Sequence, residues 1–243
     1  MISRPTVDIV IPVLNEEGSL PICLEKLLEY IKSQPRYEWN ITIADNGSTD
    51  LTGQIGQDFS KNNLNISYLY LSEKGRGRAL KYAWAESNCD VMVYMDVDLS
   101  TNLNALISLV DSIYVDNFDL CVGSRLSQES KVVGRKMIRE VMSRGYNLLI
   151  NILFPFNGFS DAQCGFKGVS NKVVNNILPY IKDNEWFFDT ELLLMCKYNS
   201  MSLKEIPVYW KDDPDTRVKI ISTIWKDIKG LFRLRFMGFN KEF

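Results

Sequence analysis

Short apolar segments alternate with amphipathic ones along the chain, and this alternation restricts the fold more than any other feature. Runs rich in β-branched and aromatic residues predict buried strands. Strands that alternate with helices form a mostly parallel sheet with helices on both faces, so we expect an α/β protein. The predicted strands cover residues 7–14, 41–44, 66–71, 90–98, 118–125 and 203–210, with another entered from 161–167. The predicted helices cover residues 20–31, 79–87, 103–114, 132–154 and 186–197, with another beginning near 51.

The predicted strand 90–98 ends in two carboxylates, Asp96 and Asp98. Two positions apart in an extended chain, they would lie on the same side and could hold one divalent cation. Open α/β sheets bind ligands at the carboxyl ends of their strands. Mg²⁺ and Mn²⁺ favour carboxylate oxygens together with substrate phosphates. The pair therefore predicts a metal–diphosphate site, although an isolated Asp-x-Asp can also serve a turn or a helix cap.

The composition excludes several kinds of chemistry. The 243 residues include no histidine, which excludes Ser-His-Asp and Cys-His catalysis and histidine-bound zinc. The five cysteines contain no Cys-x-x-Cys pair, which favours reduced thiols in a cytosolic protein. A net charge of −2 gives no general attraction to nucleic acid. Catalysis would have to rely on carboxylates, arginine, lysine and a metal.

Two polar turns carry further candidate ligands. Asp45 follows the second predicted strand and could accept hydrogen bonds from a base or ribose, although its turn could equally be a helix cap. Gly75 and Gly77 would permit close approach of a backbone to a phosphate, and Arg76 offers a cation between them.

Residues 217–243 combine apolar residues at helical spacing with a basic polar side. Such a helix is typical of a membrane interface, and a terminal helix packed on its domain has the same pattern. Residues 146–156 are apolar on nearly all sides and would be buried or lie against lipid. No signal peptide precedes the first strand and no apolar run is long enough to span a bilayer, so we expect a soluble or peripheral protein.

Five motifs, in order, resemble family 2 glycosyltransferases of the GT-A fold. They are PVLNE at 12–16, DNGSTD at 45–50, GRGRAL at 75–80, DVD at 96–98 and GSR at 123–125. Three later segments, DAQCGFK at 161–167, DTE at 189–191 and EIPV at 205–208, are most similar to polyprenyl-phosphate sugar synthases. Within these, dolichyl-phosphate β-glucosyltransferases are the nearest branch and mannose synthases the next. The resemblance extends over residues 7–236.

The resemblance implies a GT-A (Rossmann-like) domain over residues 1–216 and a basic amphipathic tail at a membrane interface. It implies inverting transfer of a sugar, glucose from UDP-glucose in particular, to polyprenyl or dolichyl phosphate, with Mg²⁺ or Mn²⁺. Another donor such as GDP-mannose or a UDP-linked N-acetylhexosamine or galactose, or a saccharide or protein acceptor, stays open. A nucleotide-binding module without catalysis is a further alternative, and nucleic-acid binding has little support.

The resemblance also assigns roles to residues. Asp45 would contact the base, Asp96 the ribose or sugar, and Asp98 the metal, with Asp96 beside it as a second ligand. The acceptor phosphate would be received by Arg125, Arg135 and Arg139, and Arg217 would close over the donor phosphates. The remaining donor-binding residues would be Pro12, Asn15, Glu17, Gly75 and Arg76.

The sequence departs from the family pattern at Asn46, where a second acidic residue is usual, at Glu73 in place of Asn, and at Arg76 in place of Lys. The membrane-spanning helices of many relatives are missing. We therefore expect peripheral attachment to the cytoplasmic face of a membrane, or contact through a membrane-embedded partner or a homo-oligomer.

The expected chemistry agrees with the lack of histidine. A lipid monophosphate has its second ionisation near pH 6, as phosphorylated side chains do, so it is an anionic nucleophile at neutral pH without a strong base. The difficulty is repulsion between this anion and the donor diphosphate. Arginines on the acceptor and a metal on the leaving group would reduce it, and in-line attack would invert the anomeric carbon.

Overall fold

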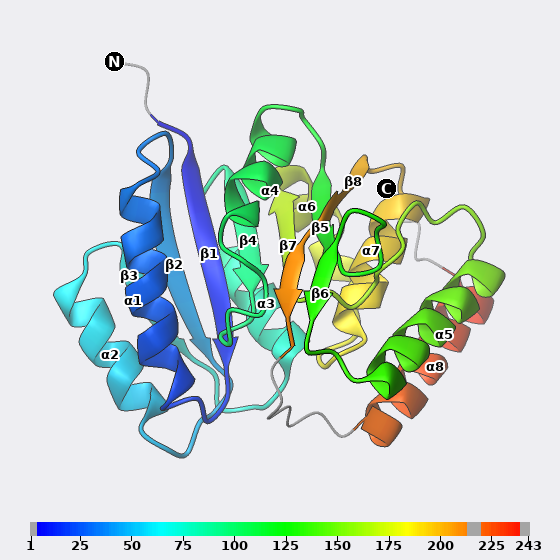
Figure 1. Ribbon diagram of the computed structural model, residues 1–243, viewed down its shortest axis with the longest axis horizontal. Coiled ribbons are helices and arrows are strands. Elements are labelled where there is room, and N and C mark those ends of the chain that lie inside the picture. The colour runs from blue at the N-terminus through cyan, green and yellow to red at the C-terminus, as the bar shows by residue number, and fades with distance from the viewer. Residues whose placement is uncertain (1–3, 213–219, 239–243) are drawn as a thin grey trace.

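The computed structural model describes residues 4–212 and 220–238. A seven-stranded sheet has the strand order β3-β2-β1-β4-β7-β5-β8, and β6 pairs with β9 (Figure 1). The strands are β1 (Thr6–Val13), β2 (Glu38–Asp45), β3 (Ile66–Tyr70), β4 (Val91–Met95), β5 (Leu120–Ser124), β6 (Lys131–Val133), β7 (Phe166–Ser170), β8 (Leu203–Pro207) and β9 (Tyr209–Lys211). The helices are α1 (Ser19–Lys32), α2 (Thr52–Asn62), α3 (Arg76–Glu86), α4 (Ala105–Tyr114), α5 (Met137–Leu153), α6 (Asn171–Asn176), the 3₁₀ turn η1 (Leu178–Tyr180), α7 (Phe188–Tyr198) and α8 (Ile220–Met237).

The sheet is mostly parallel, which confirms the expected fold class. The central strand β4 is buried along its whole length and pairs in parallel with β1. Its other neighbour, β7, is antiparallel to both β4 and β5. Strands buried on both faces are typical of sheets covered by helices on two sides.

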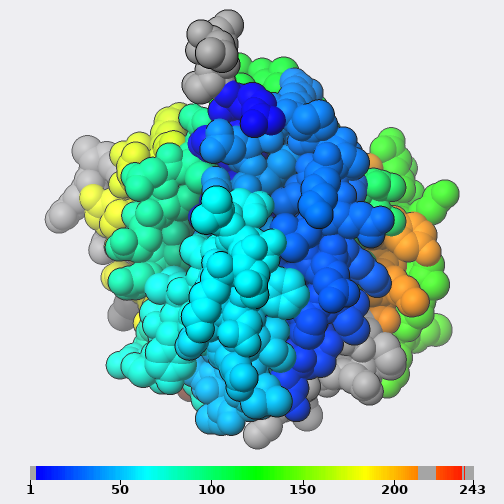
Figure 2. Space-filling view, turned by 90° about the vertical axis from the view of Figure 1, so that its left-hand side faces the viewer, coloured from blue at the N-terminus to red at the C-terminus, as the bar shows by residue number. Residues whose placement is uncertain are grey.

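Consecutive residues of β7 show which helices cover which face. Lys167 donates a hydrogen bond to Asp189 of α7 at 2.6 Å, whereas a Cβ on Gly168 would lie 2.4 Å from Leu109 of α4. Because successive strand residues face opposite sides, α7 and α4 cover opposite faces. The β3 edge is covered by α2, with α1 and α3 on either side of it (Figure 2).

The carboxyl ends of β1, β2, β4 and β5 meet along one edge of the sheet, at the bottom of Figure 1. The polar turns singled out in the sequence follow these strands. The antiparallel β7 starts at the same edge, so the segment that precedes it, residues 161–165, also lies there. This edge holds the candidate active site.

Two predicted elements are wrong in their extent. Residues 132–154 are not one helix, because Lys131–Val133 forms β6 and pairs with β9. Gly134, with φ of +78°, ends that strand in a conformation that favours glycine, and α5 begins only at Met137. The predicted strand 203–210 divides at Val208 into β8, in the main sheet, and β9, in the small one. The short helix α6 has no counterpart in the prediction.

The tail helix α8 packs on the domain beside α5 and α7 (Figure 1). Leu231 and Leu234 are buried, and a Cβ on Gly230 would lie 2.4 Å from Phe187. The opposite side exposes Trp225, so α8 is amphipathic as expected. Over the described residues, no helix combines the length and apolar character needed to cross a bilayer.

An acidic side chain, Asp227, is buried where α8 meets the domain. Its Oδ2 accepts a hydrogen bond from Nε2 of Gln163 at 2.6 Å, and its Oδ1 has no partner within the described residues. Burial raises the pKa of Asp227 to about 7, against the opposing effect of the Gln163 hydrogen bond. The folded protein therefore holds a proton that the unfolded chain releases near pH 4.

The raised pKa predicts how stability depends on pH. Between about pH 4 and 7 the folded state binds more protons, so Asp227 lowers the free energy of unfolding as pH rises, by up to about 1.4 kcal/mol per unit. Asp227→Asn keeps an oxygen for Gln163 and cannot ionise, so its unfolding free energy should exceed that of the wild type at pH 8 but not at pH 4. Urea denaturation at both pH values measures the two free energies of unfolding. The same difference between variant and wild type at pH 4 and at pH 8 would contradict the raised pKa of Asp227.

Candidate active site

The site is built around a buried ion pair that joins β5 to residues 161–165. Arg125 directly follows β5, and its Nε and Nη2 donate to the two carboxylate oxygens of Asp161 at 2.7 and 2.9 Å. Burial alone would raise the pKa of Asp161, but the Arg125 guanidinium more than offsets this and holds it below its usual value. Glu205 of β8 accepts hydrogen bonds from the N–H groups of Ser160 and Asp161. The segment before β7 is therefore fixed from two sides.

At the other end of this segment, Gly165 makes room for Asp96. The Asp96 N–H donates to the Gly165 carbonyl at 3.2 Å, and a Cβ on Gly165 would lie 1.8 Å from Asp96 Oδ2. The other carboxylate oxygen forms an ion pair with Arg76 at 2.5 Å. Burial raises the pKa of Asp96 to about 6, although the Arg76 guanidinium opposes the shift. Any side chain at position 165 would displace this carboxylate.

Arg76 is held in place by aromatic rings as well as by Asp96. Its guanidinium carbon lies 5.1 Å from the ring centre of Tyr94 and 4.9 Å from that of Trp186. The Tyr94 hydroxyl donates a hydrogen bond to Asp189, which also forms an ion pair with Lys167 at 2.6 Å. Nε of Arg76 is buried and has no hydrogen-bond partner among the described residues.

Asp96 and Asp98 both follow the end of β4. The prediction that strand periodicity places them on one side is therefore wrong. The strand ends at Met95, and the backbone turns through Leu99, whose φ is +54°. Asp98 is exposed, and its Oδ1 accepts a hydrogen bond from the Ser100 N–H at 2.8 Å. A non-glycine residue in this left-handed conformation is uncommon and is often found at functional sites.

The acidic pair fits a metal ion that shares its ligands with a substrate. In the part of the chain that the structure describes, no group of three or more acidic or cysteine side chains could enclose a metal. Mg²⁺ and Mn²⁺ usually take one or two carboxylates and complete their shell with water and phosphate oxygens. Asp98, with Asp96 behind it, offers that donor set.

The predicted donor residues lie together across β1 and β2. Pro12 pairs in register with Ala44, next to Asp45. Asp45 is buried and accepts hydrogen bonds from the Ser48 N–H at 2.8 Å and the Tyr68 hydroxyl at 2.7 Å. The neighbouring Asn46 has a buried side-chain oxygen without a partner among the described residues.

Two further predicted donor residues connect the turn after β1 to the turn after β2. Asn15, with φ of +56°, accepts the Thr49 N–H at 2.8 Å, and Glu17 accepts the Leu51 N–H at 3.0 Å. Gly75 precedes α3 with φ of +155°, and a Cβ there would lie 2.4 Å from the Asn184 carbonyl. Arg217, the last of the predicted donor residues, lies outside the described residues.

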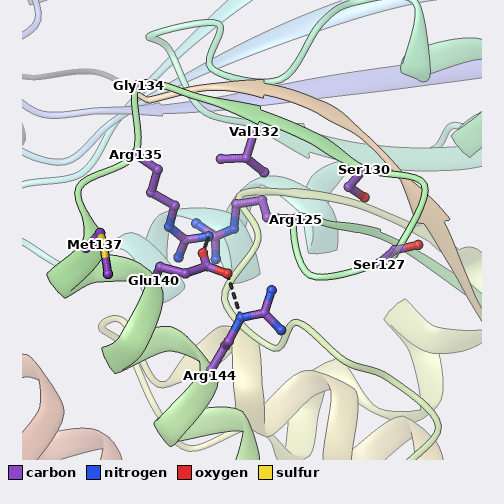
Figure 3. A pocket seen from close by; sticks show the side chains of 9 residues that line it. All are labelled: Arg125, Ser127, Ser130, Val132, Gly134, Arg135, Met137, Glu140 and Arg144. Atoms are coloured by element: carbon purple, nitrogen blue, oxygen red, sulfur yellow. Dashed lines mark hydrogen bonds and ion pairs between the residues drawn. The ribbon is translucent and has the colours of Figure 1, made fainter.

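A pocket of about 380 Å³ opens beside Arg125 and is bordered by the start of α5 (Figure 3). Its charged residues are Arg125, Arg135, Arg144 and Glu140. Glu140 pairs with Arg135 at 3.1 Å and with Arg144 at 2.6 Å. Burial and the nearby Arg125 charge lower the pKa of Arg135. Since Arg125 is already paired with Asp161, the three guanidiniums and their two carboxylate partners leave one positive charge in excess, which an anion would neutralise.

The third predicted acceptor residue, Arg139, lies differently. It forms an ion pair with Asp212 at 2.5 Å and does not line the pocket. Asp212 also accepts a hydrogen bond from the Trp210 indole, and that ring lies 4.9 Å from the Arg125 guanidinium. Arg139 therefore adjoins the pocket through Trp210. Arg144, which was not predicted as a site residue, lines the pocket.

Four residues of the site were not predicted from the sequence. They are the acidic partners of the arginines, Asp161, Glu140 and Asp212, and Gly165, which seats Asp96. Only one of these pairings had a local signal. Glu140 lies four residues before Arg144, the spacing of a helical ion pair. The others join distant parts of the chain.

Comparison with known proteins agrees with the fold and with the order of the motifs. A family model described as glycosyl transferase family 2 matches residues 8–178. A solved structure of glucosyl-3-phosphoglycerate synthase from Mycobacterium tuberculosis, in complex with Mn²⁺, uridine diphosphate and glucosyl-3-phosphoglycerate, superposes with a TM-score of 0.71. It is 14% identical and the match covers 98% of this chain and 82% of that one.

Curated relatives extend over most of this chain. Glycosyltransferase AglD of Haloferax volcanii is 31% identical over 93% of it, although the match covers only 35% of AglD. The dolichyl-phosphate beta-glucosyltransferase of Saccharomyces cerevisiae is 26% identical, over 93% of this chain and 73% of the yeast protein. The human protein of that name is 24% identical, over 84% of this chain and 67% of its own.

The fold and the family match together define a glycosyltransferase of the GT-A type. The chain belongs to glycosyl transferase family 2, as its motifs indicated.

Gly165 provides a test of the site geometry. Gly165→Ala should displace the Asp96 carboxylate from Arg76 and lower the rate of sugar transfer at least tenfold. Gly145→Ala is the matched control, because a Cβ there meets nothing within 4 Å. Circular dichroism should show both variants folded. Full activity in Gly165→Ala would contradict the assigned position of Asp96.

Proposed function

We propose that the protein transfers glucose from UDP-glucose to a polyprenyl phosphate such as dolichyl phosphate, with inversion to a β-linked product. The observation that carries the proposal is the arginine pocket beside the acidic pair. Arg125 lines the pocket and is close enough to Asp96 to oppose the rise in its pKa. A phosphate acceptor and a metal-bound diphosphate could meet between them. The names of the yeast and human relatives support the same acceptor and sugar.

The donor half of the proposal rests on the turns after β1, β2 and β3. Asp45 would orient the base, and the buried Asn46 oxygen lacks a partner among the described residues and suits an N–H donor such as that of uracil. The diphosphate would lie near Arg76, whose guanidinium carries a positive charge beside Asp96. The Mn²⁺ and uridine diphosphate named for the solved neighbour support a nucleotide of this kind.

Asp98 would hold Mg²⁺ or Mn²⁺ with Asp96 as its neighbour, and the metal, when bound, would neutralise charge on the diphosphate leaving group. The chain's own residues would do the rest. Arg76 would keep Asp96 oriented, and Arg125 and Arg135 would bind the acceptor phosphate. A phosphate monoester is largely dianionic at neutral pH, so no basic side chain would need to remove a proton.

The acceptor would place the protein at a membrane surface, peripheral on its cytoplasmic face. A membrane-embedded partner or a homo-oligomer remains compatible with this function. The site is suited to a phosphate and not to a neutral saccharide, because neutral hydroxyls would leave the excess of positive charge in the pocket uncompensated.

A donor panel tests the proposal. Purified protein, Mg²⁺ or Mn²⁺ and polyprenyl phosphate would be incubated with labelled UDP-glucose, UDP-galactose, UDP-N-acetylglucosamine or GDP-mannose, and label extracted into organic solvent would be counted. We expect extractable label from UDP-glucose that requires the metal, and a β anomer by NMR. Label that stays in water on added saccharides would reject the lipid acceptor. Label from another donor alone would reject glucose.

Asp98→Asn should lower metal-dependent transfer at least a hundredfold, because an amide is a poor ligand for a hard cation. The amide oxygen can still accept the Ser100 hydrogen bond, so the fold should be kept. Asp58→Asn, at an exposed carboxylate on α2, is the control and should keep full activity. Equal rates for the two variants over a titration of Mn²⁺ would exclude Asp98 as a ligand.

A further inference from the structure

The tail helix α8 contacts the loop that seats Asp96. That loop, residues 161–165, ends at Gly165, and the Gly165 carbonyl accepts the Asp96 N–H at 3.2 Å. From within the loop, Nε2 of Gln163 donates a hydrogen bond to Asp227 of α8 at 2.6 Å. Asp227 is 1% exposed, so water hardly competes for this hydrogen bond. The bond therefore connects α8 to the loop behind Asp96.

A second loop, residues 183–187, contacts the ion-pair partner of Asp96, which is Arg76. The Arg76 guanidinium lies over the ring of Trp186, with 4.9 Å between the guanidinium carbon and the ring centre. Two carbonyls of this loop accept the N–H groups of Gly77 and Arg78, at 3.2 and 3.0 Å. The first N–H groups of a helix have no partner within the helix. The loop therefore caps α3, the helix that carries Arg76.

The tail helix also holds this second loop, through Glu191 of α7. The Glu191 carboxylate is 1% exposed, and it accepts the N–H of Asp183 at 2.8 Å. The same carboxylate forms an ion pair with Arg233 of α8 at 2.9 Å. A buried carboxylate is costly without a partner, so Arg233 stabilises the charge that anchors the loop. A further ion pair, between Lys226 and Glu185, is exposed and would add little.

We propose that α8 is a positioning element of the active site, in which Asp227 and Arg233 hold the two loops that contact the Arg76–Asp96 pair. Arg76 begins α3 and Asp96 follows β4, so the pair joins two elements that are separate in the chain. Two loops anchored on one helix keep their distance from each other, which keeps the two side chains within reach. The inference deepens the proposed function and rests on it for the role of Asp96 beside the metal.

Apolar packing alone does not account for these contacts. It explains why Leu231 and Leu234 of α8 are buried, but it does not explain why two buried carboxylates, Asp227 and Glu191, link α8 to loops. A buried ion pair contributes no more to stability than apolar side chains of similar size. Its partners do have to keep a defined geometry. The contacts of α8 are therefore better suited to orienting the loops than to stabilising the fold.

Amide hydrogen exchange of the protein alone, measured by NMR, tests the proposal without substrate or metal. The N–H of Asp96 reports on the first loop, and those of Gly77 and Arg78 report on the second, since each donates to a carbonyl of its loop. Exchange requires the hydrogen bond to open, so its rate measures how firmly the loop is held. The amides of β4 are the reference, because a variant that loosens the whole protein would accelerate them as well.

Asp227→Ala removes the oxygen that accepts the Gln163 hydrogen bond, and it should speed exchange of the Asp96 N–H by about tenfold or more relative to β4. Asp227→Asn keeps an accepting oxygen and should exchange as the wild type does. Arg233→Ala should instead speed exchange of the two reporters of the second loop. Lys229→Ala, at an exposed position of the same helix, is the matched control and should change neither loop.

Arg233→Ala leaves the charge of Glu191 buried without its partner, which is a large cost to folding. If that variant does not fold, the double variant Glu191→Gln/Arg233→Ala replaces it. This variant has no buried charge, keeps an oxygen for the Asp183 N–H, and should show the same faster exchange in the second loop. Unchanged exchange in the folded variants would overturn the positioning role. So would equal acceleration of β4, because α8 would then only stabilise the fold.

Binding of Mn²⁺ in the presence of UDP, followed by the EPR signal of free Mn²⁺, separates positioning from the proposed function. Asp227→Ala should raise the Mn²⁺ concentration needed for half-saturation, and Lys229→Ala should not. Loop-specific exchange in a protein that binds no Mn²⁺ with UDP would reject the proposed donor site and leave the positioning role standing. Wild-type Mn²⁺ affinity in a variant with accelerated loop exchange would overturn the inference, since the loops would then move without displacing the pair.

Discussion

The buried ion pair of Arg125 with Asp161 is the interaction on which the rest of the site depends. It fixes one end of residues 161–165, and the other end of that segment, Gly165, seats the Asp96 carboxylate. Between them, Gln163 reaches the tail helix through Asp227. Removing one partner of a buried pair costs about 3–5 kcal/mol, because the other charge is left without compensation. A disturbance at this pair would therefore reach the acceptor pocket, the acidic pair and the packing of α8 together.

The charges on the two sides of this segment would suit the proposed reaction between two anions. On one side Asp96 and Asp98 offer carboxylates to a cation, and Arg76 keeps the first of them in place. On the other side Arg135 and Arg144 share Glu140, and Arg125, paired with Asp161, lines the same pocket. In a partly buried site such charges interact more strongly than in water, so their fixed placement can offset repulsion between a donor diphosphate and an acceptor phosphate. The lack of histidine fits this account, since the barrier is electrostatic.

Much of the sheet could be predicted because each main strand carries its own signal, a β-branched run that ends in a polar turn. The same turns identified the candidate ligands, since parallel strands bring their carboxyl ends to one edge. The small β6–β9 sheet could not be predicted, because its three-residue strands depend on pairing between residues about 80 positions apart. For the same reason the partners Asp161 and Asp212 were missed. Arg139 shares the predicted helix with Arg135, but only the fold reveals that it turns to Asp212.

The central claim is that the metal–diphosphate site and the arginine pocket form one active centre. The most direct measurement is ³¹P NMR of the protein with Mn²⁺, UDP and a short-chain polyprenyl phosphate, because the paramagnetic ion broadens nearby phosphorus signals. Broadening of both the UDP signals and the acceptor signal, each dependent on the protein and each lost in Asp98→Asn, is the result this account predicts. A broadened UDP signal beside a sharp signal from protein-bound acceptor would place the acceptor elsewhere and contradict it.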